Sequence, residues 1–228
     1  MNYVSIISQE IAVEKGSRIM EIILSSVSPT AHFLGKLIGI LLVILTQVVI
    51  YIGLYLLISF VLRQLNLLDS FEGLNIGELL QGSSNVVILG IVYAISGILI
   101  YTVLAGFLGS LVSKTEDVNK MITPIIFLAL GGFYIGMFAL NSTNNSLVRI
   151  TSQIPLFTPF IMPFRVAAET VSSTEIAISI VVSVLFMAFI LWFSLLFYKS
   201  NVLIYSDKGM VNAFKRSFAL WKSERASK

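Results

Sequence analysis

Residues 37–62 read LIGILLVILTQVVIYIGLYLLISFVL, a stretch that contains no Asp, Glu, Lys or Arg. A helix rises about 1.5 Å per residue, so a run of this length can cross a hydrocarbon core about 30 Å thick. Three more charge-free apolar runs follow, at 86–112, 121–140 and 176–198. The sequence therefore predicts an all-α membrane protein with about four transmembrane helices.

The composition supports this prediction and excludes several kinds of site. The 228 residues are 57% hydrophobic and only 12% charged, and the mean hydropathy is +0.93, whereas a soluble domain needs a more polar surface. The chain has no cysteine, so disulfides, thiolate metal sites and cysteine nucleophiles are excluded. The single histidine, His32, cannot form a multi-histidine metal site. We predict no cofactor and no metal site.

Basic residues are divided unequally between the two sides of the predicted spans. One side holds 12 of the 15 Lys and Arg residues, including every lysine, and the other holds only Arg63, Arg149 and Arg165. Loops that carry the excess of basic residues usually stay in the cytoplasm. The sequence therefore predicts a multi-pass protein of the cell membrane with both termini cytoplasmic, rather than a nucleic-acid-binding surface. Residues 63–85 and 141–175 are then the outer connections.

The segment at 10–28 precedes the first span and is predicted to be an amphipathic cytoplasmic helix that ends before Pro29. Glu14, Arg18 and Glu21 recur at intervals of three or four residues, as side chains on one helical face do. A helix that only lies on the lipid surface favours basic residues, whereas this face mixes both signs. Docking to another protein and binding to the inner leaflet are both open.

Two further segments are predicted to be structured outside the spans. The second outer connection contains three prolines at intervals of four residues, Pro155, Pro159 and Pro163, which argue against an undisturbed helix. Its apolar residues predict a helical or re-entrant segment at the outer interface, with a short helix over 165–173. The tail at 200–228 is basic and amphipathic, so it is predicted to lie on the cytoplasmic leaflet.

Small residues recur at four-residue spacing within the spans, a pattern that lets helix backbones approach closely in lipid. The pairs are Gly35 with Gly39, Ala105 with Gly109, and Gly132 with Gly136. They indicate either a seam between two subunits or ordinary packing within one subunit.

A catalytic site within the membrane is not predicted. The spans hold no carboxylate or amine, although ion-coupled carriers and intramembrane hydrolases usually place ionisable groups at membrane depth. The lone histidine, His32, lies at the inner boundary, and no carboxylate accompanies it in the sequence. A transporter driven by a partner outside the membrane fits this pattern better.

Residues 11–29 read IAVEKGSRIMEIILSSVSP and are followed by Gly35 and Lys36. With these residues, the first 36 positions resemble the coupling-helix region of ABC-2-type exporter permeases. The resemblance, greatest to the sodium-export and drug-export permeases of Gram-positive bacteria, continues at 113–120, 155–165 and 198–205. Members of that subgroup usually have six spans, with a first span and a large outer domain before the coupling helix. The chain therefore resembles the C-terminal portion of such a permease, from a truncated reading frame or a split gene.

The resemblance implies the membrane-spanning permease subunit of an ATP-driven exporter of sodium, a drug or a peptide. Its partners would be a second permease subunit, identical or different, and a separate cytoplasmic ATPase, because the chain has no Gly-x-x-x-x-Gly-Lys-Ser/Thr sequence to bind nucleotide phosphates. The chain itself would then not be an enzyme. The resemblance assigns ATPase coupling to Glu14, Lys15, Arg18 and Glu21, and anchoring of the first span to Lys36. A non-transporting scaffold or sensor for envelope stress is the alternative.

Overall fold

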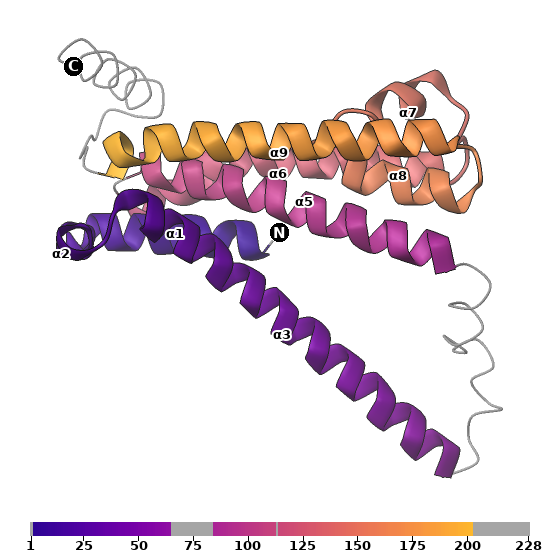
Figure 1. Ribbon diagram of the computed structural model, residues 1–228, viewed down its shortest axis with the longest axis horizontal. Coiled ribbons are helices and arrows are strands. Elements are labelled where there is room, and N and C mark those ends of the chain that lie inside the picture. Colours follow the sequence, from indigo (N-terminus) through magenta and orange to yellow (C-terminus); the bar gives the residue numbers. More distant parts are fainter. Residues whose placement is uncertain (1, 65–83, 113, 203–228) are drawn as a thin grey trace.

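The computed structural model describes residues 2–64, 84–112 and 114–202, and every element within these ranges is a helix (Figure 1). The helices are α1 (Asn2–Gly16), α2 (Ile19–Ser26), α3 (Pro29–Gln64), α5 (Ser84–Leu111), α6 (Thr115–Ala139), α7 (Ser146–Thr151), α8 (Thr158–Ala167) and α9 (Ser173–Val202). Four of them, α3, α5, α6 and α9, are long and apolar enough to cross a membrane. The predicted fold class, an all-α membrane protein with about four spans, is confirmed.

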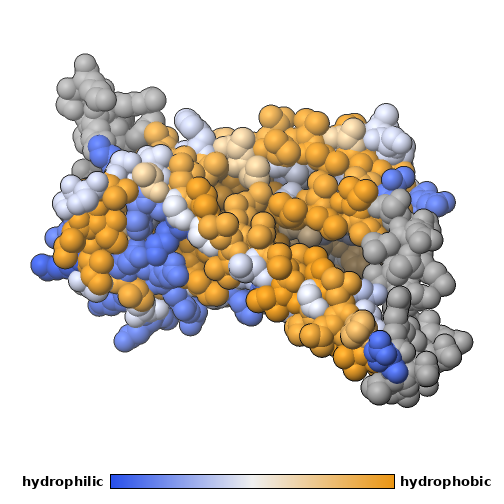
Figure 2. All heavy atoms as spheres, turned by 60° about the horizontal axis from the view of Figure 1, so that its bottom comes forward, coloured by the Kyte–Doolittle hydropathy of each residue, from blue (hydrophilic) through white to orange (hydrophobic). Residues whose placement is uncertain are grey.

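Helix α5 is the centre of the bundle and packs against α1, α6, α8 and α9, with α1 and α2 toward one end and α7 and α8 at the other (Figure 1). We call the end that carries α2 the basic end, because the described lysines gather there: Lys15, Lys36, Lys114, Lys120 and Lys199. Arg149 and Arg165 lie at the opposite end, which we call the α8 end. Hydrophilic residues are concentrated toward the two ends, and hydrophobic residues cover the length between them (Figure 2).

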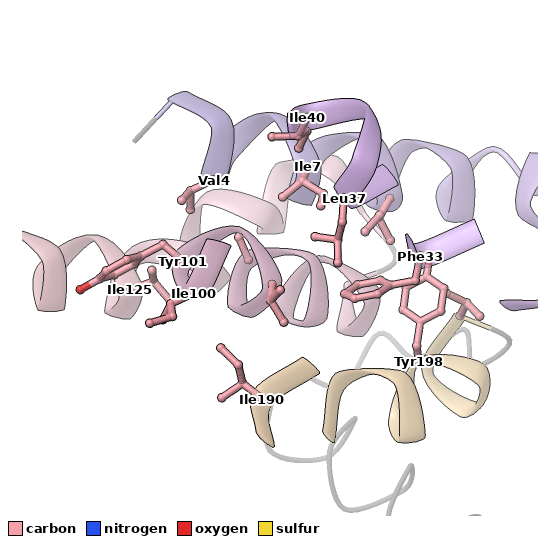
Figure 3. Close-up of a cluster of buried hydrophobic side chains, with 14 of the residues drawn as sticks. Val4, Ile7, Phe33, Leu37, Ile40, Ile100, Tyr101, Ile125, Ile190 and Tyr198 are labelled. Carbon is pink, nitrogen blue, oxygen red and sulfur yellow. The ribbon is translucent and has the colours of Figure 1, made fainter. Parts of the chain in front are cut away.

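Helix α3 leaves the bundle soon after it begins. It starts at Pro29, whose fixed φ and missing N–H suit the first position of a helix. Its buried side chains, Phe33, Leu37 and Ile40, all lie near this start, and the rest of the helix diverges from α5 (Figure 1). The rings of Phe33 and Tyr198 pack with their centroids 4.7 Å apart (Figure 3). Contacts between α3 and the bundle are therefore concentrated at the basic end.

The segment at 10–28 is two helices, whereas a single helix was predicted. Helix α1 ends at Gly16 and α2 begins at Ile19, because Arg18 has a left-handed backbone conformation with φ of 61°. This break turns α2 away from the axis of α1, which packs against α5 and α6. As expected, α2 ends before Pro29.

The connection between α6 and α9 contains two short helices, α7 and α8, but the second begins earlier than predicted. It covers Thr158–Ala167 rather than 165–173. Pro159 sits in its first turn, where a missing N–H removes no helical hydrogen bond, and Pro163 removes only one bond from a short helix. Residues 65–83 and the tail beyond Val202 lie outside the described residues, so what was predicted for them stays a prediction.

Two of the three small-residue pairs serve packing within this chain. A Cβ added at Gly109 would lie 2.7 Å from the Cα of Ser8, so α1 can approach α5 only because Gly109 has no side chain. A Cβ at Gly136 would lie 2.5 Å from the main-chain oxygen of Phe160 in α8. At Gly35 and Gly39 an added Cβ would meet no described atom within 4 Å. A seam between subunits stays a prediction for this last pair.

Candidate coupling site at the basic end

A ladder of acids and bases joins α1 to α3. Glu10 and Glu14 are four residues apart on α1, and His32 and Lys36 are four apart on α3, so each pair shares one face of its helix. The Nζ atom of Lys36 lies 2.6 Å from Oε1 of Glu14 and 3.0 Å from Oε2 of Glu10. The Nε2 atom of His32 lies 3.0 Å from Oε2 of Glu14, although these two atoms are not aligned for a hydrogen bond. The ladder fixes the angle at which α3 leaves α1.

The imidazole of His32 also reaches α9. Its Nδ1 atom forms a hydrogen bond with the Tyr198 hydroxyl at 2.9 Å. The expectation that no carboxylate accompanies His32 was therefore wrong, because Glu14 comes from another helix. A carboxylate, an imidazole and a hydroxyl in a row can orient one another as in a catalytic triad. The Tyr198 side chain is fully buried, however, so no substrate reaches its oxygen, and the row connects helices instead.

Glu14 is ionised in this setting. Burial alone would raise the pKa of Glu14, but the hydrogen bond and positive charge of Lys36 and the neighbouring imidazole of His32 outweigh it and hold that pKa below its usual value. The contact between α1 and α3 is therefore an ion pair at neutral pH. Within the described ranges, no group of three or more His, Cys, Asp or Glu side chains is placed to hold a metal ion.

Lys15 points into the bundle and joins α1 to two further helices. Its ammonium donates hydrogen bonds of 2.7 Å to the main-chain oxygens of Ser110 and Asn201. Ser110 lies in the last turn of α5, where carbonyl groups lack helical partners and the helix dipole attracts positive charge. The Asn201 amide adds a 3.2 Å bond to the Ser110 hydroxyl. Burial lowers the pKa of Lys15 to about 8, so at neutral pH a mostly charged ammonium connects α1, α5 and α9.

Helix α2 presents most of its surface outward. Met20 is its buried side chain, whereas Ile22 is 72% exposed and Arg18 and Glu21 are also exposed. A groove of about 380 Å³ lies beside the start of α2, between the end of α1 and the start of α6. Its lining mixes apolar and charged residues: Val13, Gly16, Ser17, Lys114, Thr115 and Glu116. An exposed apolar helix with charges of both signs is suited to contact a protein.

The structure does not bring the predicted site residues to one surface. Glu14, Lys15 and Lys36 hold helices together, while Arg18 and Glu21 face outward. Contact of each with an ATPase stays a prediction. Sequence reasoning missed the partners of the inward group: Glu10, His32, Ser110, Tyr198 and Asn201.

Comparison with known proteins identifies the family. Residues 1–196 match the family model described as ABC-2 family transporter protein. The chain is 38% identical over 223 residues to the uncharacterized protein YhaP of Bacillus subtilis, covering 97% of this chain and 52% of that protein. It is 25% identical over 202 residues to the uncharacterized protein MJ1024 of Methanocaldococcus jannaschii, covering 89% of this chain and 46% of that one. The chain thus spans about half the length of the curated relatives it matches, and no solved structure matches it. With its four apolar spans, the chain belongs to the ABC-2 family of transporter proteins as a multi-pass membrane protein.

Proposed function

We propose that the chain is a permease subunit of an ATP-driven exporter and that a separate cytoplasmic ATPase binds it at the basic end. Family membership supports the class of protein. The observation that carries the coupling role is the exposed helix α2, because it is short, carries Glu21 with Arg18 directly before its start, and is attached at both sides to the spans. The excess of lysine at this end supports its cytoplasmic location.

Two sets of contacts connect α2 to the spans: the Glu14–Lys36 pair and the hydrogen bonds of Lys15. A displacement of α2 would act on α3 through the pair of Glu14 with Lys36, and on α5 and α9 through Lys15. Packed helices move as rigid bodies that change partners at their interfaces, which is how a local force becomes a change of access. ATP hydrolysis in the partner would thus alternate exposure of a cargo site between the two sides. The cargo classes that the family resemblance suggests are sodium, a drug or a peptide.

A second permease subunit is part of the proposal. Most of α3 beyond Ile40 exposes apolar side chains, and Gly35 and Gly39 present an open backbone surface. Small residues at this spacing allow close helix contact in lipid. A subunit of the same kind, identical or different, packed along α3 fits this surface.

The decisive experiment changes the charge of α2 without disturbing the ladder. Glu21→Lys alters an exposed residue, whereas a change at Glu14 would also break its pair with Lys36. If α2 docks to the ATPase through charges of both signs, the amount of ATPase recovered with Glu21→Lys should fall about tenfold or more. A helix that only binds lipid should gain about 1 kcal/mol of membrane attraction. Glu169→Lys, at the α8 end, is the control with the same change in net charge.

The measurement is co-purification of a cytoplasmic ATPase with the permease, with the ATPase identified by mass spectrometry and its amount normalised to the permease inserted in the membrane. We expect reduced recovery with Glu21→Lys and unchanged recovery with Glu169→Lys. Equal recovery with both variants would remove the docking role of α2. Absence of any ATPase with the wild-type chain would favour the scaffold or sensor alternative.

A further inference from the structure

One row of side chains on α3 changes from apolar to polar near the middle of its span. Spacings of three and four residues mark one face of a helix, and this row consists of Phe33, Leu37, Ile40, Ile44, Gln47, Tyr51 and Tyr55. Its first three members are buried against the bundle. Gln47 and Tyr51 lie on either side of the middle of the charge-free run at 37–62, and Tyr51 is 60% exposed. The face that packs on the bundle at the start of α3 is therefore polar and uncovered at mid-membrane depth.

The polar side chains of this row form a chain of hydrogen bonds. The Tyr3 hydroxyl of α1 donates to Oε1 of Gln47, and the Gln47 amide donates to the Tyr51 hydroxyl. None of the described residues accepts the hydrogen of the Tyr51 hydroxyl itself. Lipid tails cannot accept it, and polar side chains within spans usually bond to a neighbouring helix. The chain of hydrogen bonds thus ends at an accessible donor that lacks an acceptor.

A second row, on α5, is also covered at one end and exposed at the other. Ile98 and Thr102 line a cavity of about 320 Å³ beside Tyr3, in the first turn of α1. Ile91 and Ile95 continue this face of α5 at spacings of three and four residues, and both are exposed. Helix α5 extends for about 20 Å beyond Ile98 toward the α8 end. Helix α1 therefore covers the row only in the half of the bundle near the basic end.

The two rows together indicate what covers them beyond α1, where α3 and α5 diverge and no described helix lies in the angle between them (Figure 1). The α5 row requires an apolar surface about 20 Å long, and Tyr51 requires an acceptor at mid-depth. A helix in line with α1 supplies both, whereas lipid tails supply only the first. The chain spans about half the length of its curated relatives, which hold about as many residues again outside the matched part. That length is sufficient for further membrane helices.

We infer that a transmembrane helix of a separate polypeptide packs between α3 and α5 in line with α1, and that an uncharged acceptor side chain on it, such as Asn or Gln, receives the hydrogen of Tyr51. The second permease subunit proposed above contacts Gly35 and Gly39, which lie on another face of α3. The inferred helix is therefore an additional partner. Its binding requires no ATPase, so this inference and the docking of an ATPase to α2 can fail separately.

The first test is photo-crosslinking in the membranes of the cells that produce the chain. Benzoylphenylalanine replaces Ile95, in the exposed part of the α5 row, and in the control chain it replaces Phe127, which is exposed on α6. Mass spectrometry identifies the attached peptides. We expect the probe at position 95 to attach to an apolar run of about 18 residues or more in another polypeptide, at least tenfold more than the probe at position 127. Attachment to lipid alone, to a second copy of this chain, or to a segment outside such a run would overturn the inference.

The second test isolates the hydrogen bond of Tyr51. The probes are two synthetic transmembrane peptides of Leu and Ala, one with a single central Asn and one with Leu in its place. Each is mixed in lipid nanodiscs with the full chain that carries benzoylphenylalanine at position 95, and the adduct yield measures binding. The Asn peptide should bind about fivefold better, which corresponds to one neutral hydrogen bond.

Two matched variants complete the second test. Tyr51→Phe keeps the ring and removes the hydrogen, so the preference for the Asn peptide should disappear. Tyr134→Phe is the control, because Tyr134 is an exposed tyrosine on α6, and it should keep the preference. Equal binding of the two peptides to the wild-type sequence, or an unchanged preference in Tyr51→Phe, would refute the role of Tyr51.

Discussion

The burial of Lys15 makes a prediction about how stability changes with pH. Its pKa of about 8 in the folded chain is lower than the value of about 10.4 for an unfolded lysine. Below pH 8 both states hold the proton, and the folded state carries the full cost of a buried charge. Between pH 8 and about 10.4 the folded state loses its proton while the unfolded state keeps it. The free energy of unfolding should therefore rise across this window.

The size of the rise follows from the two pKa values. A difference of one in pKa corresponds to about 1.36 kcal/mol, so the full rise is about 3 kcal/mol. Lys15→Met removes the titrating group and should abolish the rise. At neutral pH the same variant loses two hydrogen bonds to Ser110 and Asn201 but also loses the cost of the buried charge. Its stability there should lie within about 2 kcal/mol of the wild type, so the pH slope is the informative quantity.

The assay is reversible unfolding by sodium dodecyl sulfate in mixed micelles, followed by tryptophan fluorescence from pH 7 to about pH 10.5. Lys199→Met is the matched control, because Lys199 is exposed at the same end of the bundle. We expect parallel pH profiles for the wild type and Lys199→Met, and a flatter profile for Lys15→Met. A Lys15→Met profile that rises as steeply as the wild type would refute the assignment of the buried ammonium.

Three further predictions address the backbone break, the α8 end and the topology. Arg18→Gly removes the strain of a side chain at positive φ and should stabilise the chain by up to about 1 kcal/mol in the same unfolding assay. Arg165→Gln removes a buried guanidinium that donates to the Ser152 hydroxyl at 2.6 Å and lies 3.0 Å from the partly exposed Glu175 carboxylate, so it should cost about 2 kcal/mol and speed hydrogen exchange in α8. Cysteines at Lys114 and Ser146 of this cysteine-free chain should react with impermeant maleimide from opposite sides of the membrane. Reaction of both cysteines from the same side would contradict the predicted topology.

The spans were predictable because their signal is local. A charge-free apolar run of about 20 residues must form a helix in lipid, where its backbone groups have no other partners. The structure has helices over all four predicted runs. The helix at 158–167 was placed too late because three prolines were taken as breaks, although Pro159 falls where a helix tolerates proline. The rule that proline breaks a helix was applied without knowing at which residue the helix begins.

The contacts at the basic end could be predicted only in part. The spacing of Glu10 with Glu14 and of His32 with Lys36 is a readable signal for two complementary helix faces. The turn at Arg18, which brings these two faces together, could not be predicted. The apolar periodicity of the sequence continues through this single residue with a left-handed backbone. The burial of Lys15 has no local signal at all. It depends on the ends of α5 and α9, which lie 95 and 186 residues away in the chain.

Lysines near a membrane boundary therefore have two uses that composition cannot separate. All five described lysines count toward the predicted orientation, yet Lys15 and Lys36 are also used to hold α1 against three other helices. A helix that merely rests on lipid needs no such attachment, since apolar burial and anionic lipid suffice. Helix α2 is instead fixed on one side by Lys15, through α1, and on the other by the ladder to α3. A force on its exposed face would be passed to the spans through these contacts, and this supports the proposed coupling role of α2.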